Sequence, residues 1–227
     1  MNETPGINLF DGVNPTITSP YSPFSLPFYQ TRETLIDIEV YQKFISNATK
    51  QFRRTKVYTH YKGFLMQLGM DRCQLHYNIT SEMAELEMHH NMITIYDIAI
   101  IITEHILNTK GYITTFDLVH LLREVHTKHK VQLVMLSLTT HQALHNTDEV
   151  FIHPDMCVGK WWEFLEEYKT GITPDIGRKI ITSLNKAIDL GMSTDGELSK
   201  IRDRIKDWSG YNECNECKCL PNDSMYY

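Results

Sequence analysis

The chain has 227 residues, 42% of them hydrophobic, which suits one sizeable domain with extensions and excludes disorder throughout. The formal net charge of −6 excludes a global basic field, so any contact with nucleic acid must come from a local patch. No apolar run reaches the roughly 18 residues of a membrane helix, and no signal peptide is apparent. The five cysteines are odd in number and indicate reduced thiols in a cytosol.

Residues 1–30 predict an extended arm. The stretch "NPTITSPYSPFSLPFY" repeats proline, which removes backbone donors and keeps the preceding residues out of the helical region. The arm also holds several aromatic side chains, more than a free linker needs. We expect these rings to lie against the arm's own domain or against a partner protein.

Residues 31–72 predict helices with a basic and aromatic surface, because apolar residues recur there near helical spacing. The segment "TKQFRRTKVYTHYKGF" is the most basic part of an acidic chain. Its cations are suited to phosphate contacts, although a solvated helix face accounts for the same pattern. The candidate nucleic-acid-binding residues are Arg53, Arg54, Lys56 and Lys62.

Residues 73–153 begin with an alternating stretch, "CQLHYNITSEMAELEMHH", that predicts a half-buried strand in a β-hairpin. Two helices follow, each opened by a capping-box pattern. Thr94 and Asp97 begin the first helix, and Thr114 and Asp117 begin the second. The next segment, "VQLVMLSLTTHQALHNTDEVFIHP", predicts an apolar strand, a short helix and a further short strand at "EVFI".

Residues 154–208 predict C-terminal amphipathic helices, so the expected class is a mostly helical α+β fold. Residues 209–227 form a polar tail in which Cys214, Cys217 and Cys219 have zinc-like spacing. Three thiols leave a tetrahedral site one ligand short. A second metal site in the tail and an unliganded tail are therefore both open.

Four histidines form a candidate metal centre. His141 and His145 are four residues apart, so on a helix they share one face and one metal ion. His89, at the end of the predicted strand, can supply a third ligand. Three protein ligands leave a position open for water or a phosphate oxygen. The adjacent His90 can act as a general base, provided that the chain bends enough to bring it to the same side as His89.

The segments "EMHH" and "QLVMLSLTTHQALH", in that order, resemble the HNH (ββα-metal) nuclease motif. The resemblance covers residues 73–153 and implies a ββα-metal finger with two inserted helices. It assigns the metal to His89, His141 and His145 and the general base to His90. Gln132 stands where the family has asparagine, with the role of orienting the base. The implied cofactor is a divalent metal: zinc, magnesium, manganese or nickel.

Two functions follow from these residues. The first is a metal-dependent endonuclease that hydrolyses DNA in the cytoplasm of a bacterial or phage-infected cell. The second is a catalytically inactive zinc-site protein that binds or assembles other components, such as those of a phage complex. The position of His90 discriminates between them: an open metal position within its reach favours the enzyme, and burial under the inserted helices favours assembly.

Overall fold

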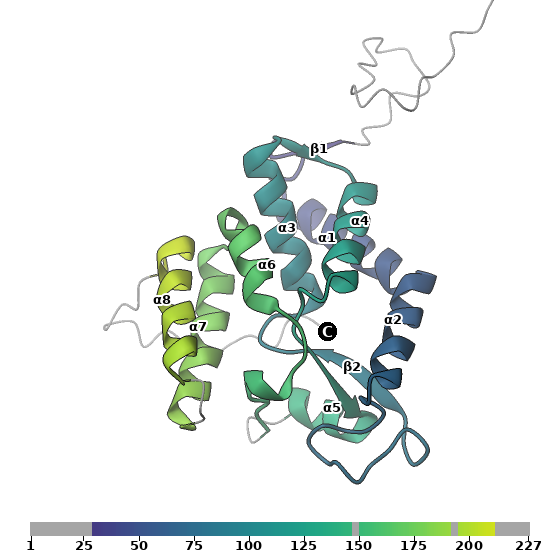
Figure 1. Ribbon diagram of the computed structural model, residues 1–227. Helices are drawn as coiled ribbons and strands as arrows, with labels where there is room; N and C mark the ends of the chain where they lie inside the picture. The colour runs from purple at the N-terminus through teal and green to yellow at the C-terminus, as the bar shows by residue number, and fades with distance from the viewer. Residues whose placement is uncertain (1–28, 147–149, 192–194, 212–227) are drawn as a thin grey trace, which may run out of the picture.

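The computed structural model describes residues 29–146, 150–191 and 195–211, which form a helical assembly with two small sheets (Figure 1). The predictions for most of the arm and for the cysteine tail lie outside these residues. No described helix is long and apolar enough to cross a membrane. The elements in order are β1 (Gln30–Thr31), α1 (Ile38–Arg53), α2 (Lys56–Gln67), β2 (Leu86–His90), α3 (Ile95–Thr109), β3 (Tyr112–Ile113), α4 (Thr115–Thr127), β4 (Leu133–Ser137), α5 (Leu138–Asn146), η1 (Pro154–Met156), α6 (Trp161–Glu167), η2 (Lys169–Gly171), α7 (Pro174–Asp189) and α8 (Asp195–Ser209).

The mostly helical α+β class is confirmed, and both predicted capping boxes are present. Thr94 Oγ1 accepts a hydrogen bond from the Asp97 backbone N–H at 3.1 Å, and the Asp97 carboxylate accepts one from the Thr94 N–H at 2.9 Å. Thr114 and Asp117 make the same exchange before α4. Each box satisfies two backbone donors that a helix start otherwise leaves open, which fixes where α3 and α4 begin.

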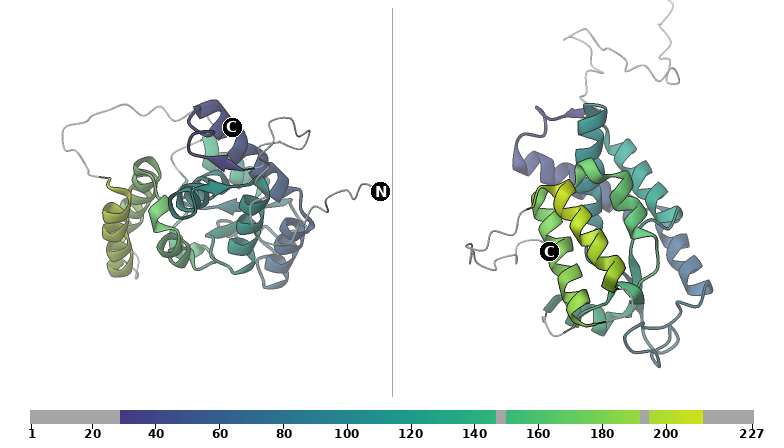
Figure 2. Two further views of the ribbon diagram at one scale, coloured as in Figure 1. Left: turned by 90° about the horizontal axis from the view of Figure 1, so that it is seen from above. Right: turned by 60° about the vertical axis from the view of Figure 1, so that its left-hand side comes forward.

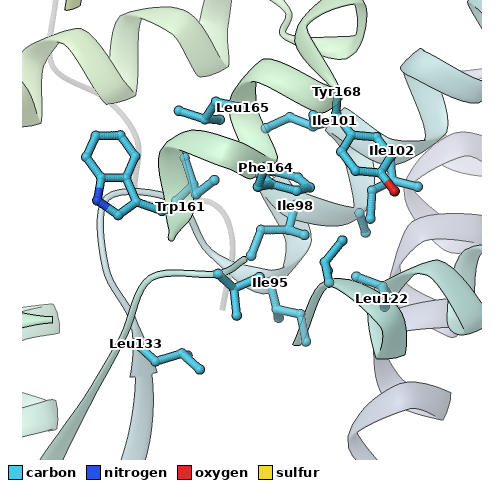
Figure 3. Close-up of a cluster of buried hydrophobic side chains, with 14 of the residues drawn as sticks. Ile95, Ile98, Ile101, Ile102, Leu122, Leu133, Trp161, Phe164, Leu165 and Tyr168 are labelled. Atoms are coloured by element: carbon cyan, nitrogen blue, oxygen red, sulfur yellow. The ribbon is translucent and has the colours of Figure 1, made fainter. Parts of the chain in front are cut away.

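α3 forms the centre of the core. A helix that is apolar on nearly every side is stable only when other elements surround it, and α3 is covered by α1, α4, α6 and η2 (Figure 2). The aromatic side chains of α6 pack against it from one side (Figure 3). The buried side chains labelled there are Ile95, Ile98, Ile101, Ile102, Leu122, Leu133, Trp161, Phe164, Leu165 and Tyr168.

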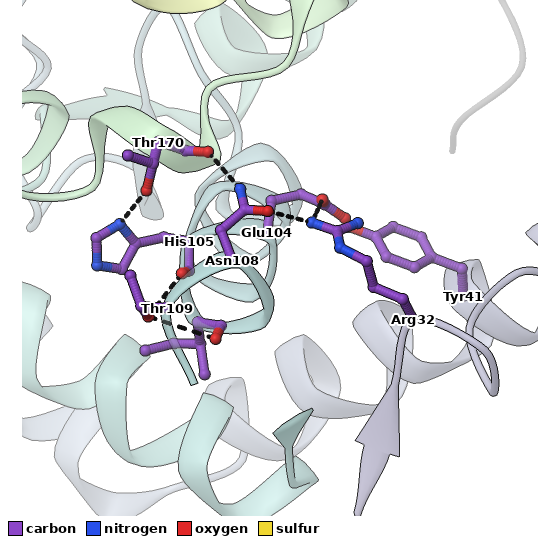
Figure 4. Close-up of polar contacts among 8 residues, drawn as sticks. Arg32, Tyr41, Glu104, His105, Asn108, Thr109 and Thr170 are labelled. Atoms are coloured by element: carbon purple, nitrogen blue, oxygen red, sulfur yellow. Dashed lines mark hydrogen bonds and ion pairs between the residues drawn. The ribbon is translucent and has the colours of Figure 1, made fainter. Parts of the chain in front are cut away.

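A polar network on α3 ties two distant segments together (Figure 4). Arg32, which precedes α1, donates hydrogen bonds to Glu104 at 3.0 Å and to Asn108 at 2.6 Å. Tyr41 of α1 donates to the other oxygen of Glu104 at 2.9 Å. The amide of Asn108 donates in turn to the carbonyl of Thr170 at 2.7 Å. The start of α1 and η2 are thus held to the same turn of α3.

β2 and β4 form an antiparallel pair whose register runs from Leu86 opposite Ser137 to His90 opposite Leu133. The predicted alternation in β2 is confirmed, since Leu86, Met88 and His90 are buried and the two residues between them are half-buried. The predicted β-hairpin is wrong. The preceding residues form turns with one isolated antiparallel bridge, from Arg72 to Thr80, and β2 pairs instead with a strand beyond α4.

The described residues do not form a ββα-metal finger. All five residues of β4 are buried, so this strand lies within the core that also contains α3, α6 and α7, and does not belong to a self-contained finger. The short strand predicted at "EVFI" is also not formed by its described residues, 150–152. Instead, the chain enters the 3-10 turn η1 at Pro154, where the proline ring favours a helical turn start.

Replacement of Gly171 tests the close packing of η2 on α3. A Cβ atom at this position would lie 1.9 Å from the Ile101 carbonyl oxygen and 2.7 Å from the His105 backbone nitrogen. We expect Gly171→Ala to lower the free energy of unfolding by roughly 2 kcal/mol or more, through overpacking against rigid backbone. The matched control is Gly63→Ala in α2, where a Cβ meets nothing within 4 Å. Urea denaturation of both variants measures the difference, and equal stabilities would contradict this packing.

Candidate metal centre

His89, His141 and His145 converge between β2 and α5. Each offers one ring nitrogen, and these three atoms lie within 4.8 Å of one another. The pleat of β2 turns His89 toward the half-buried face, and helical spacing puts His141 and His145 on one side of α5. The predicted grouping of these three histidines is present in the structure as a possible metal-binding triad.

The distances suit tetrahedral coordination after small side-chain rotations. The Nε2 atoms of His141 and His145 are 3.0 Å apart, and the ring of His89 lies 5.0 Å from that of His141 and 5.4 Å from that of His145, between centroids. Zinc–nitrogen bonds of about 2.0 Å require nitrogen atoms about 3.3 Å apart. The donor set therefore fits a single transition-metal ion.

The protonation states also favour metal binding. Burial, together with the neighbouring His141 and His145, lowers the pKa of His89 to about 3. Burial and His141 lower the pKa of His145, against an opposing effect of Glu87. These two imidazoles are therefore neutral near pH 7. A metal ion binds the neutral form and has no proton to displace from them.

Glu87 orients one of the ligands. The Nδ1–H of His141 donates to the Glu87 carboxylate at 2.5 Å, so Nε2 of His141 presents its lone pair toward the site. A carboxylate on the outer nitrogen is the usual support of a metal-binding histidine, because it fixes the tautomer and raises ligand basicity. Glu87 was not among the site residues predicted from the sequence. Its position two residues before His89, and so on the same face of the strand, is the signal that identifies it.

Apart from the histidine cluster, few side chains hold α5 against the rest of the protein. Of its nine residues only Thr140 is buried, and that side chain shares a hydrogen bond with Ser137 at 2.8 Å. Apolar packing therefore contributes little to holding this helix on the sheet. A metal ion shared between His89 of β2 and the two histidines of α5 would cross-link this helix to the sheet.

His90 points to the opposite face of β2 and lies beneath α4. Its side chain is buried, and its Nε2 lies 2.9 Å from Nε2 of His126. Nδ1 of His126 donates to the Leu122 carbonyl at 2.6 Å, so His126 accepts from His90. Burial, followed by the nearby His126 and Arg53, lowers the pKa of His90 well below its usual range. The strand does not bend to bring His90 to the metal side.

Gln132 lies in the connection between α4 and β4, directly before β4. It is buried, its amide donates to the Pro154 carbonyl at 3.5 Å, and its backbone carbonyl accepts from the Asn91 N–H at 3.3 Å. Among the described hydrogen bonds none joins Gln132 to His90. The structure places this amide where it holds the chain around Pro154.

The predicted nucleic-acid-binding residues lie around the turn between α1 and α2. Arg53, Arg54 and Lys56 are exposed and Lys62 is half-buried. Contact with nucleic acid stays a prediction for these four residues. Cys214, Cys217 and Cys219 lie outside the described residues.

A family model described as Bacteriophage G278-like virion protein matches residues 23–209, and the chain therefore belongs to that family. Neither the curated proteins nor the solved structures contain a match to the chain. The HNH assignment and the predicted DNA endonuclease function are wrong, and the inferred phage source is supported. Two pairs of histidines and an intervening amide are short patterns, and they arise here in a protein of another family.

Metal binding is testable by mass spectrometry and calorimetry. We expect the purified protein to bind about one zinc ion per chain through its three histidines. His89→Ala should abolish stoichiometric binding, whereas His120→Ala, an exposed histidine of α4, should leave it intact. Glu87→Gln should keep the stoichiometry but weaken the affinity roughly 10- to 100-fold, because the carboxylate supports His141. Full-affinity binding by His89→Ala would contradict the site.

The buried His90–His126 pair predicts acid sensitivity. Burial lowers the pKa of His126 to about 4, whereas an unfolded histidine titrates near 6.5. The unfolded chain therefore binds more protons, and stability falls as pH drops from about 6.5 toward 4, by roughly 3 kcal/mol from this residue. Urea titrations at pH 7 and pH 5 should show the loss, and His126→Gln should make it smaller. If the variant loses as much free energy of unfolding between pH 7 and pH 5 as the parent chain, this account is contradicted.

Proposed function

We propose that this protein is a structural or assembly component of a bacteriophage virion. The observation that carries the proposal is membership of a virion-protein family over residues 23–209. The burial of His90 beneath α4 supports it, because the candidate general base is then separated from the metal ligands by the thickness of the sheet. On this proposal the protein is made in the infected cell and acts within the particle.

We further propose that His89, His141 and His145 hold zinc as a structural ion. Three imidazoles suit zinc, nickel or copper, whereas magnesium and manganese prefer oxygen ligands. The support for a structural role is the weak packing of α5, which has one buried residue. Zinc bound by the folded chain and not by the unfolded chain stabilises the fold, by about 2.7 kcal/mol when its free concentration is 100 times the dissociation constant.

The partners on this proposal are other virion proteins. The predicted arm, rich in proline and aromatic residues, is a candidate for such a contact, because extended proline-rich segments lose little conformational freedom when they dock. The family match begins at residue 23, so it covers only the last part of this predicted arm.

Purified particles of the phage that encodes the chain provide the test. We expect quantitative mass spectrometry of gradient-purified virions to find the protein at a constant copy number per particle, retained through high-salt washing. A non-virion phage protein from the same lysate is the control for carry-over. Abundance in the lysate combined with loss from washed virions would contradict a virion role.

A further inference from the structure

The turn between α1 and α2 carries cations that are left unneutralised. Residues 40–70 hold six of the chain's 22 lysines and arginines and none of its 28 acidic residues. Nine lysines and arginines elsewhere form ion pairs, but no pair joins the cations of this turn to an acidic residue in the described ranges. The basic end of α1, as we define it, consists of Lys50, Arg53, Arg54 and Lys56, all of which are exposed.

This concentration of positive charge is unfavourable in the isolated chain. Arg53, Arg54 and Lys56 are close in sequence and all exposed, so they repel one another. Lys56 also stands in the first turn of α2, which has no acidic residue, although the dipole of a helix disfavours cations there. Such an arrangement becomes favourable when an anionic surface docks against it.

The opposite end of α1 carries the complementary charge. Glu33 and Glu39 are exposed and form no ion pair in the described part of the chain, and Asp37 caps the helix through the Glu39 N–H at 2.8 Å. Aliphatic side chains alternate with these acids and are exposed to water: Ile36 by 86%, Ile38 by 65% and Val40 by 45%. The acidic end of α1 comprises Glu33, Ile36, Asp37, Ile38, Glu39 and Val40.

The two ends are separated along the molecule. α1 has 16 residues and is therefore about 24 Å long. The acidic end lies near β1 at the top of Figure 1, whereas α2 lies at the right-hand edge. The ends are too far apart to neutralise each other within one chain, where charges beyond about 8 Å are screened at physiological salt. Each end can instead meet the other end of a second molecule.

We propose that copies of this chain associate head to tail, with the acidic end of α1 on one copy docked against the basic end on the next. The occupant is a second copy because the same chain offers both charges. Exposed apolar side chains accompany the acidic end, at Ile36, Ile38 and Val40, and Phe64 and Leu68 are exposed further along α2 from the basic end. Such a heterologous contact closes into a ring or extends as a filament. The inference rests on the proposed virion role, in which copies of the chain occupy one particle.

Sedimentation velocity of the purified full chain tests the contact. We expect the mean mass to rise above the 26.5 kDa of the monomer as protein concentration increases. Raising salt from about 50 mM to about 500 mM shortens the screening length to about 4 Å and should weaken the association about tenfold. The apolar side chains should retain part of it.

Two charge reversals identify the surfaces. Arg53→Glu/Arg54→Glu leaves the basic end with no net charge, because Lys50 and Lys56 remain, and Glu33→Lys/Glu39→Lys makes the acidic end basic, with the capping Asp37 kept. We expect each variant alone to be monomeric and an equimolar mixture to associate again. Lys169→Glu/Lys200→Glu, on exposed residues of η2 and α8, is the control for the first variant's change in net charge and should associate like the parent.

The outcomes are distinct. Loss of association in both variants with recovery in the mixture supports the contact. A parent chain that stays monomeric at every concentration, or a mixture that does not recover, overturns it. If the parent chain stays monomeric and its basic end binds a DNA duplex, the surface is a nucleic-acid-binding surface instead. Absence of the protein from virions would overturn the proposed function without altering self-association in solution, so the two failures are distinguishable.

Discussion

The antiparallel pairing of β2 with β4 is the constraint on which the candidate site depends. It joins residues 86–90 to residues 133–137 across a segment that contains α3 and α4. Because α5 follows β4 without a break, the same pairing sets α5 beside β2 and brings His141 and His145 to His89. The site therefore depends on a strand pairing that spans two helices.

The pleat of β2 gives two neighbouring histidines different environments. His89 faces α5, where Glu87 and the other imidazoles prepare a metal site. His90 faces α4 and completes a buried hydrogen bond with His126. One face of the strand thus supports metal binding and the other supports the core, and no side chain is shared between these two roles. This division is physically consistent with a metal ion that fastens the fold.

Local features of the sequence predicted much of this structure. Side-chain periodicity predicted the burial pattern of β2, capping chemistry predicted the starts of α3 and α4, and helical spacing placed His141 beside His145. Strand pairing was not predictable in the same way, because the partner of β2 lies beyond two helices and leaves no local signal. The buried partner of His90 was missed for the same reason, since His126 reaches it only through the tertiary packing of α4. The family was also misassigned, because short histidine patterns carry less information than a match over most of the chain.

X-ray absorption spectroscopy of the zinc-loaded full chain tests the proposed site, in which three imidazoles hold a transition metal and join β2 to α5. Nitrogen and sulfur ligands lie at different distances from the ion. We expect nitrogen or oxygen neighbours at about 2.0 Å, outer-shell scattering typical of imidazole, and no sulfur. A sulfur shell at about 2.3 Å would contradict the proposed site and would place the metal on cysteine thiols.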